Sequence, residues 1–287
     1  MIEGSNHSGA VPEGRWERSL FFLDRVWELF RGDRALIAVA AVGTVLNVVA
    51  AAVIFGLAEW LVGDAGMRAF ATVSLAAIAL PATIVSTFCN VALVRMAQAR
   101  FEGRRCTARQ GFAAARARWR PILAWSLLSV GVGAALDWLA DKLPFGGALA
   151  SWLLGAAWSL GTMFAIPVLA LEDVGARRAA KRSVALFRAR WGESLGGTVS
   201  VSFVSFVATL PGGLLLLGGL AAGGAAGVAL AAGGGALLLA AITVTRALDE
   251  LFALAVYRFE TAGAASFGLE PSQLDAFVDV KRRRDDR

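Results

Sequence analysis

The sequence predicts an all-α, polytopic membrane protein with six transmembrane helices and three cytoplasmic or interfacial amphipathic helices. Of its 287 residues, 57% are hydrophobic, compared with roughly 45–50% in soluble domains. The excess is concentrated in long uncharged runs, and the basic residues flank those runs. We expect one six-span membrane domain over residues 16–262, between a disordered tail at 1–15 and a polar tail at 263–287.

The uncharged runs predict the spans, because a membrane-crossing helix needs about 20 mostly apolar residues. Three runs, 35–58, 69–94 and 147–171, each supply one helix, and the shorter run 121–136 can extend past Asp137 to Ala140. The run from 194 to 245 is too long for one helix and carries glycines at its centre, which favours two spans joined by a turn. The expected spans are 35–60, 69–95, 121–140, 147–171, 194–217 and 230–257.

The distribution of Lys and Arg predicts the orientation. Twenty-six of the 28 basic residues fall within 1–34, 95–120, 172–193 and 246–287, and the other two are Arg68 and Lys142. We therefore expect both termini on the cytoplasmic side. All but three of the basic residues are Arg, a usage typical of GC-rich bacteria, so the predicted location is a bacterial cytoplasmic (inner) membrane. The polar N-terminal segment does not resemble a signal peptide.

Three segments preceding pairs of spans have apolar stripes at helical spacing: 16–31, 104–120 and 176–191. The second begins with Thr107 and Gln110, the spacing of a capping box. The second and third end in the same four residues, Arg-Ala-Arg-Trp, at 116–119 and 188–191. This pattern predicts a threefold internal repeat of one amphipathic helix followed by two spans.

These amphipathic segments are the expected lipid contacts, because Trp prefers the headgroup layer and Arg attracts anionic lipid. Packing against the ends of the spans, as a cap, is an equally weighted and compatible interpretation. The interfacial candidates are Trp16, Trp27, Trp119, Trp191, Arg116, Arg118, Arg188 and Arg190. Membrane lipids with anionic headgroups are thus the expected partners, and nucleic acid is not expected.

Ionisable and amide side chains inside spans are functional candidates by default. Arg246, Asp249 and Glu250 lie three and four residues apart near the last span, where a structural ion pair is favoured over a substrate site. Asn90 belongs to a polar patch with Ser86, Thr87 and Cys89, and Asn47 of the first span is its expected partner.

Enzyme chemistry is not expected. The only histidine is His7, in the N-terminal tail, and the two cysteines form no CxxC motif. Catalytic residues, metal ligands and cofactors are therefore not predicted.

Several motifs resemble a family of uncharacterised prokaryotic six-span membrane proteins. They include 87–94 (TFCNVALV), 111–115 (GFAAA), 125–128 (WSLL), 167–172 (PVLALE), 180–183 (AKRS), 191–193 (WGE) and 255–259 (AVYRF). The resemblance covers residues 16–262 and extends distantly to the membrane domain of some glycerophosphodiester phosphodiesterases. It carries no catalytic motif, and Arg246 stands where such proteins are expected to have a small or apolar residue.

The leading functional prediction is a non-enzymatic scaffold or lipid-interacting, membrane-organising protein. The alternative is a small transporter or channel that uses polar residues of the second and sixth spans. A water-accessible cavity that reaches Asn90 and Arg246 would favour this alternative.

Overall fold

The computed structural model describes residues 27, 30–62, 67–143, 146–191 and 196–262. Every element in these ranges is a helix. The predicted tails at 1–15 and 263–287, and most of the amphipathic segment 16–31, lie outside them. The helices are α2 (Arg34–Val62), α3 (Met67–Phe101), α4 (Ala108–Ala117), α5 (Trp119–Lys142), α6 (Gly147–Gly161), α7 (Ala165–Leu171), α8 (Ala176–Trp191), α9 (Gly196–Ala222) and α10 (Gly224–Ala262).

Four described segments are long and apolar enough to cross a membrane: Ala79–Phe101, Trp119–Lys142, Gly147–Leu171 and Gly224–Arg258. Two shorter apolar stretches, Arg34–Ala50 and Val207–Ala222, lie in α2 and α9 where side chains are described. The chain is therefore a membrane protein by the length and composition of its helices.

The fourth expected span, 147–171, is not one continuous helix. It consists of α6 and α7, separated by turns at residues 162–164. Pro167 has no N–H group to donate to the Met163 carbonyl oxygen, which favours a break at this turn. The Ser183 side chain of α8 bridges the break, accepting from the Phe164 N–H (3.0 Å) and donating to the Gly161 carbonyl oxygen (2.8 Å).

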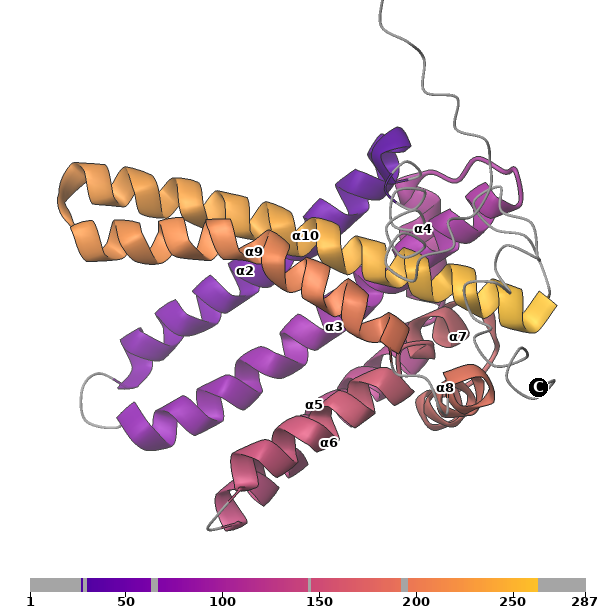
Figure 1. Ribbon diagram of the computed structural model, residues 1–287, viewed down its shortest axis with the longest axis horizontal. Helices are drawn as coiled ribbons and strands as arrows, with labels where there is room; N and C mark the ends of the chain where they lie inside the picture. Colours follow the sequence, from indigo (N-terminus) through magenta and orange to yellow (C-terminus); the bar gives the residue numbers. More distant parts are fainter. Residues whose placement is uncertain (1–26, 28–29, 63–66, 144–145, 192–195, 263–287) are drawn as a thin grey trace, which may run out of the picture.

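The long helices form three hairpins: α2 with α3, α5 with α6, and α9 with α10. Figure 1 shows the hairpins fanning out from one end of the molecule, where α4, α7 and α8 gather. We call this end the basic end, because α4, α8 and the neighbouring connections carry Arg104, Arg116, Arg118, Arg177, Arg178, Lys181 and Arg182.

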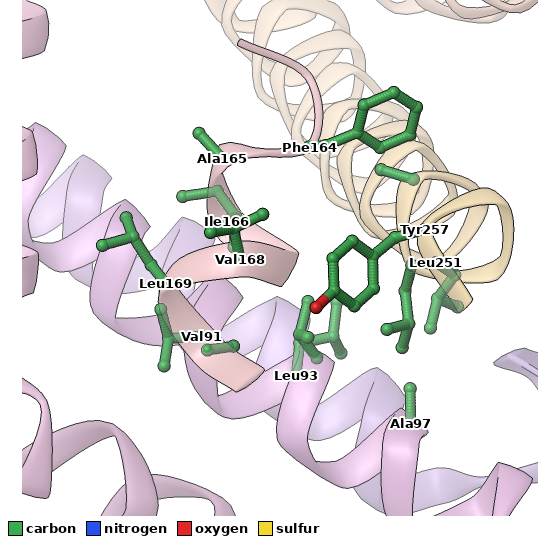
Figure 2. Packing of buried hydrophobic residues seen from close by; sticks show 14 of the residues in the cluster. Val91, Leu93, Ala97, Phe164, Ala165, Ile166, Val168, Leu169, Leu251 and Tyr257 are labelled. Atoms are coloured by element: carbon green, nitrogen blue, oxygen red, sulfur yellow. The ribbon is translucent and has the colours of Figure 1, made fainter. Parts of the chain in front are cut away.

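The hydrophobic core lies at the basic end. It is built from residues 91–97 of α3, 164–170 around α7 and 251–257 of α10, with Ile122 and Trp125 of α5. In Figure 2, Leu93 and Ala97 of α3 and Leu251 and Tyr257 of α10 face one another beside Val168 and Leu169 of α7. Away from this core the hairpins expose apolar faces, for example Leu214 (68% exposed) and Val228 (69%), as expected of surfaces in contact with lipid tails.

The short helices pack against the ends of the long ones. The segment expected as one helix over 104–120 is helical from Ala108 to Ala117, and α5 begins at Trp119. Its predicted capping box is present, with Thr107 and Gln110 bonded reciprocally. Helix α8 buries Ala176, Ala179, Ser183 and Leu186 and exposes basic residues between them.

Candidate functional site

A pocket of about 500 Å³ lies between α2, α3 and α10. Its lining residues on each helix recur at spacings of three and four, so each helix presents one continuous face. These faces are 40, 43, 44, 47 and 48 on α2; 79, 82, 83, 86, 89, 90 and 93 on α3; and 239, 242, 243, 246 and 247 on α10. The polar members are Thr44, Asn47, Thr83, Ser86, Asn90, Thr243 and Arg246. We refer to this space as the polar pocket.

Helices α2 and α3 approach closely at Gly43. A Cβ atom at position 43 would lie only 3.0 Å from the Cβ atom of Cys89. One turn further along α2, the Asn47 amide donates to the Ser86 hydroxyl oxygen (3.0 Å) and to the Gly43 carbonyl oxygen (2.8 Å). The glycine therefore permits the approach that brings the Asn47 amide to α3.

Hydrogen bonds also join α10 to both other helices. The Thr243 hydroxyl lies 2.7 Å from the Thr44 hydroxyl of α2. The Asn90 amide of α3 donates to a Glu250 carboxylate oxygen at 2.9 Å, and the other oxygen of that carboxylate is buried without a hydrogen-bond donor among the described residues. These contacts fix three helices around the pocket.

The polar groups of the three helices lie at similar depth. Asp33, which precedes α2, forms an ion pair with Arg100 near the end of α3 (2.6 Å), and the Arg258 guanidinium of α10 stacks over the Phe101 ring (5.0 Å). The basic ends of α2, α3 and α10 are thus level. At 1.5 Å per residue, Asn47, Asn90 and Arg246 lie about 16–20 Å along their helices from those contacts.

The local ion pair expected between Arg246 and its two neighbouring carboxylates is not the observed arrangement. No nitrogen of Arg246 comes within 4.0 Å of an oxygen of Asp249 or Glu250, all three being described residues. Glu250 instead bonds Asn90 of α3. Asp249 is exposed on another face of α10 and does not line the pocket. The Arg246 side chain makes no hydrogen bond or ion pair with any described residue, although it lines the polar pocket.

The sequence prediction located part of this site. Asn47, Asn90 and Arg246 line one pocket, and Glu250 is linked to it through Asn90. Asn47 does contact the predicted polar patch, but it bonds Ser86 and not Asn90, and Thr87 is buried outside the lining. Thr44, Thr83 and Thr243 were missed. Each lies three residues before Asn47, Ser86 or Arg246, and this spacing is the signal that could have found them.

The predicted interfacial residues are partly placed. Trp119 is 54% exposed with Arg120 stacked on its ring, and Trp27 is 36% exposed. Arg116 and Arg188 are exposed. Arg118 is instead held inside the fold, donating to the Glu172 carbonyl oxygen (2.6 Å) and pairing with Asp173 (3.0 Å). Trp16 and the side chains of Arg190 and Trp191 lie outside the described part of the chain.

One known protein family matches this chain. The model of a family of unknown function (DUF6159) matches residues 69–267. The chain belongs to this family. No curated protein and no solved structure matches it, so the distant likeness to the membrane domain of glycerophosphodiester phosphodiesterases stays an expectation. The family match spans α3 to α10, and it therefore includes Asn90 and Arg246 but leaves out α2 and Asn47.

Proposed function

We propose that this protein is a non-enzymatic transporter or channel for a small anion, and that the anion passes through the polar pocket. The observation that carries the proposal is Arg246, which lines a pocket of about 500 Å³ without a hydrogen bond or ion pair to any described residue. A cation within a membrane span is costly unless something neutralises it, and here, among the described residues, only the longer-range attraction of Asp249 and Glu250 acts on Arg246. A small anion bound beside six neutral hydroxyl and amide side chains would neutralise it.

The same geometry weighs against the scaffold as the leading interpretation. A scaffold needs no polar lining between its spans, and the hydrogen bonds of Asn47 and Asn90 alone would suffice to hold three helices together. These two hydrogen bonds do not explain why Arg246 lines a pocket. Intramembrane arginines with a functional role generally face a cavity or pathway.

For the topology we propose six spans, with both termini in the cytoplasm of a bacterium. The proposal adds α2 and α9 to the four long apolar segments, because each is the partner of a long helix in a hairpin. It is supported by the concentration of basic residues at the end where the hairpins meet. The order of one short helix followed by one hairpin, as in α4–α5–α6 and α8–α9–α10, supports a repeat.

The lipid-interacting scaffold remains a second candidate, because a separate observation favours it. Trp119 and Arg116 are exposed next to the first turn of α5, and α8 exposes Arg177, Arg178, Lys181, Arg182 and Arg188. Exposed Trp and Arg at the end of spans are suited to anionic headgroups. This role is compatible with transport, since it uses a different surface.

Anion flux into proteoliposomes tests the transport proposal. Purified protein would be reconstituted in phosphatidylcholine vesicles and assayed with chloride, nitrate, acetate and phosphate. We expect flux above that of empty vesicles for at least one anion, and its loss in Arg246→Leu. The triple variant Arg246→Leu, Asp249→Leu, Glu250→Leu removes the cation together with both neighbouring carboxylates. It should therefore fold yet stay inactive. If wild-type flux equals that of empty vesicles, the scaffold becomes the better account. If the triple variant retains the wild-type flux, the anion does not depend on Arg246 and the proposed route through the polar pocket is wrong.

A further inference from the structure

A second cavity, of about 630 Å³, lies at the basic end and shares no residue with the polar pocket. It is enclosed by the end of α3, the connection to α4, α4 itself, and the ends of α7 and α10. The lining residues are Arg95, Gln98, Ala99, Glu102, Arg104, Cys106, Gln110, Ala114, Leu171, Tyr257, Arg258 and Thr261. We refer to this space as the basic cavity. Its charged lining residues are three arginines and one glutamate.

Two of these arginines have buried donors without an acceptor. The Nε atoms of Arg95 and Arg258 are inaccessible to solvent, and neither finds a hydrogen-bond acceptor in the part of the chain that the structure describes. Arg258 is held in place by its stacking on Phe101. A buried guanidinium donor without an acceptor is destabilising. The terminal nitrogens of Arg95 and Arg258 are not buried in this way and make no hydrogen bond within the described residues, so they are the donors that a ligand in the cavity would meet.

Glu102 carries the one carboxylate among the lining residues, and it does not pair with Arg95 or Arg258 because it already accepts other hydrogen bonds. It accepts hydrogen bonds from Arg104 and from the Gln98 amide. These two bonds lower the pKa of Glu102, so it stays ionised and committed to its partners at neutral pH. Tyr257, another lining residue, donates its hydroxyl proton to Glu172 at 2.9 Å. The positive charge of Arg95 and Arg258 is therefore not neutralised by an ion pair within the cavity.

We propose that the basic cavity binds a phosphate group, held by the Arg95 and Arg258 guanidinium groups. The planar, multiply donating guanidinium matches the oxygens of a phosphate better than any other side chain. The volume admits a ligand larger than phosphate alone. Because the cavity lies beside the ends of membrane-spanning helices, the phosphate comes from a lipid headgroup or from a soluble phosphorylated compound.

The test measures thermal stabilisation of the full-length protein by two probes. One arm adds inorganic phosphate to protein in a neutral detergent. The other compares nanodiscs of phosphatidylcholine with nanodiscs containing about one-fifth phosphatidic acid. The variant is Arg95→Gln with Arg258→Gln. The control is Arg105→Gln with Arg109→Gln, which removes the same charge from two exposed residues near the cavity that do not line it.

We expect at least one probe to raise the melting temperature of the wild type and of the control, and to leave the Gln variant unchanged. Phosphate alone doing so identifies a soluble ligand, and phosphatidic acid alone identifies a lipid. If the Gln variant fails to fold, Arg95→Lys with Arg258→Lys keeps both charges but loses the planar fork, and its apparent affinity for the probe should fall at least tenfold. The proposal is overturned if neither probe stabilises the wild type, or if the variants respond as the wild type does. Anion flux through the polar pocket is unaffected by either result, so the two proposals fail separately.

Discussion

One hydroxyl group, that of Ser183, bridges the break between α6 and α7. It is fully buried and serves two backbone groups that no longer belong to a continuous helix, the Gly161 carbonyl and the Phe164 N–H. Ser126 is equally buried but donates only to Ile122, a carbonyl of its own helix. The two residues thus differ in the number of backbone groups that depend on them.

Replacing Ser183 by Ala should accordingly lower the free energy of unfolding by about 1–3 kcal/mol, because buried backbone groups lose their partners. Ser126→Ala should cost less, since the Ile122 carbonyl keeps its place in the helix. Thermal unfolding of both variants in detergent compares them. Equal losses would show that the break is held by other contacts.

The Asn90–Glu250 hydrogen bond is the contact that ties α3 to α10 beside the polar pocket. A double-mutant cycle with Asn90→Leu and Glu250→Leu should give a coupling energy of about 0.6–1.7 kcal/mol, the range for polar contacts between membrane helices. Unfolding of the two single variants and the double variant provides the cycle. A coupling energy of zero would mean that the two side chains do not meet in the membrane.

At the scale of elements, α9 and α10 are held together by close backbone approach. A Cβ atom at Gly212 would lie 2.5 Å from the Leu238 nitrogen, whereas a Cβ atom at its neighbour Gly213 meets nothing within 4 Å. The two glycines share one helix and one membrane environment, so each is the matched control for the other.

Gly212→Ala should therefore force the hairpin apart and destabilise it, by about 1–3 kcal/mol as for other overpacked sites. Gly213→Ala should be neutral or slightly stabilising, because Ala favours the helix over Gly. Thermal unfolding again provides the measurement. A more damaging Gly213→Ala would mean that α9 is rotated about its axis relative to this structure.

The sequence predicted where the long helices lie because their signal is local, although α3 and α10 extend five or six residues beyond the expected spans. A run of apolar residues is sufficient to place α5 to within two residues at each end. Pro167 is a local signal for a kink in the fourth span, whereas the Ser183 contacts that bridge the break come from a different helix and were not predicted. The expected pairing of Arg246 with Asp249 and Glu250 was wrong for the same reason, because the deciding contact comes from another helix. Spacing along α10 placed two carboxylates within reach, but Glu250 bonds Asn90, a residue 160 positions away.

At the scale of the whole molecule, the arrangement of hairpins predicts which connections share a side of the membrane. In a chain without native cysteines, a single Cys at position 64 or 144 should react with an impermeant reagent added outside. A Cys at position 110 or 182 should react only after the cells are opened. External labelling at either of the latter positions would reverse the orientation proposed from the basic residues.

The central claim is that the polar pocket holds water and a small anion inside the membrane. Its most direct test is the reaction rate of a small anionic methanethiosulfonate with single cysteines in the same Cys-free background. Positions 44 and 86 line the pocket, whereas Val45 and Val49 are exposed on α2 without lining it.

We predict that Thr44→Cys and Ser86→Cys react at least tenfold faster than Val45→Cys and Val49→Cys, because ionised thiolates form in water and not in lipid. Adding Arg246→Leu should slow both pocket positions, since the anionic reagent loses its attraction to the guanidinium. Equal and negligible rates at all four positions would contradict the account, because the pocket would then be dry and the anion proposed for it would have no route.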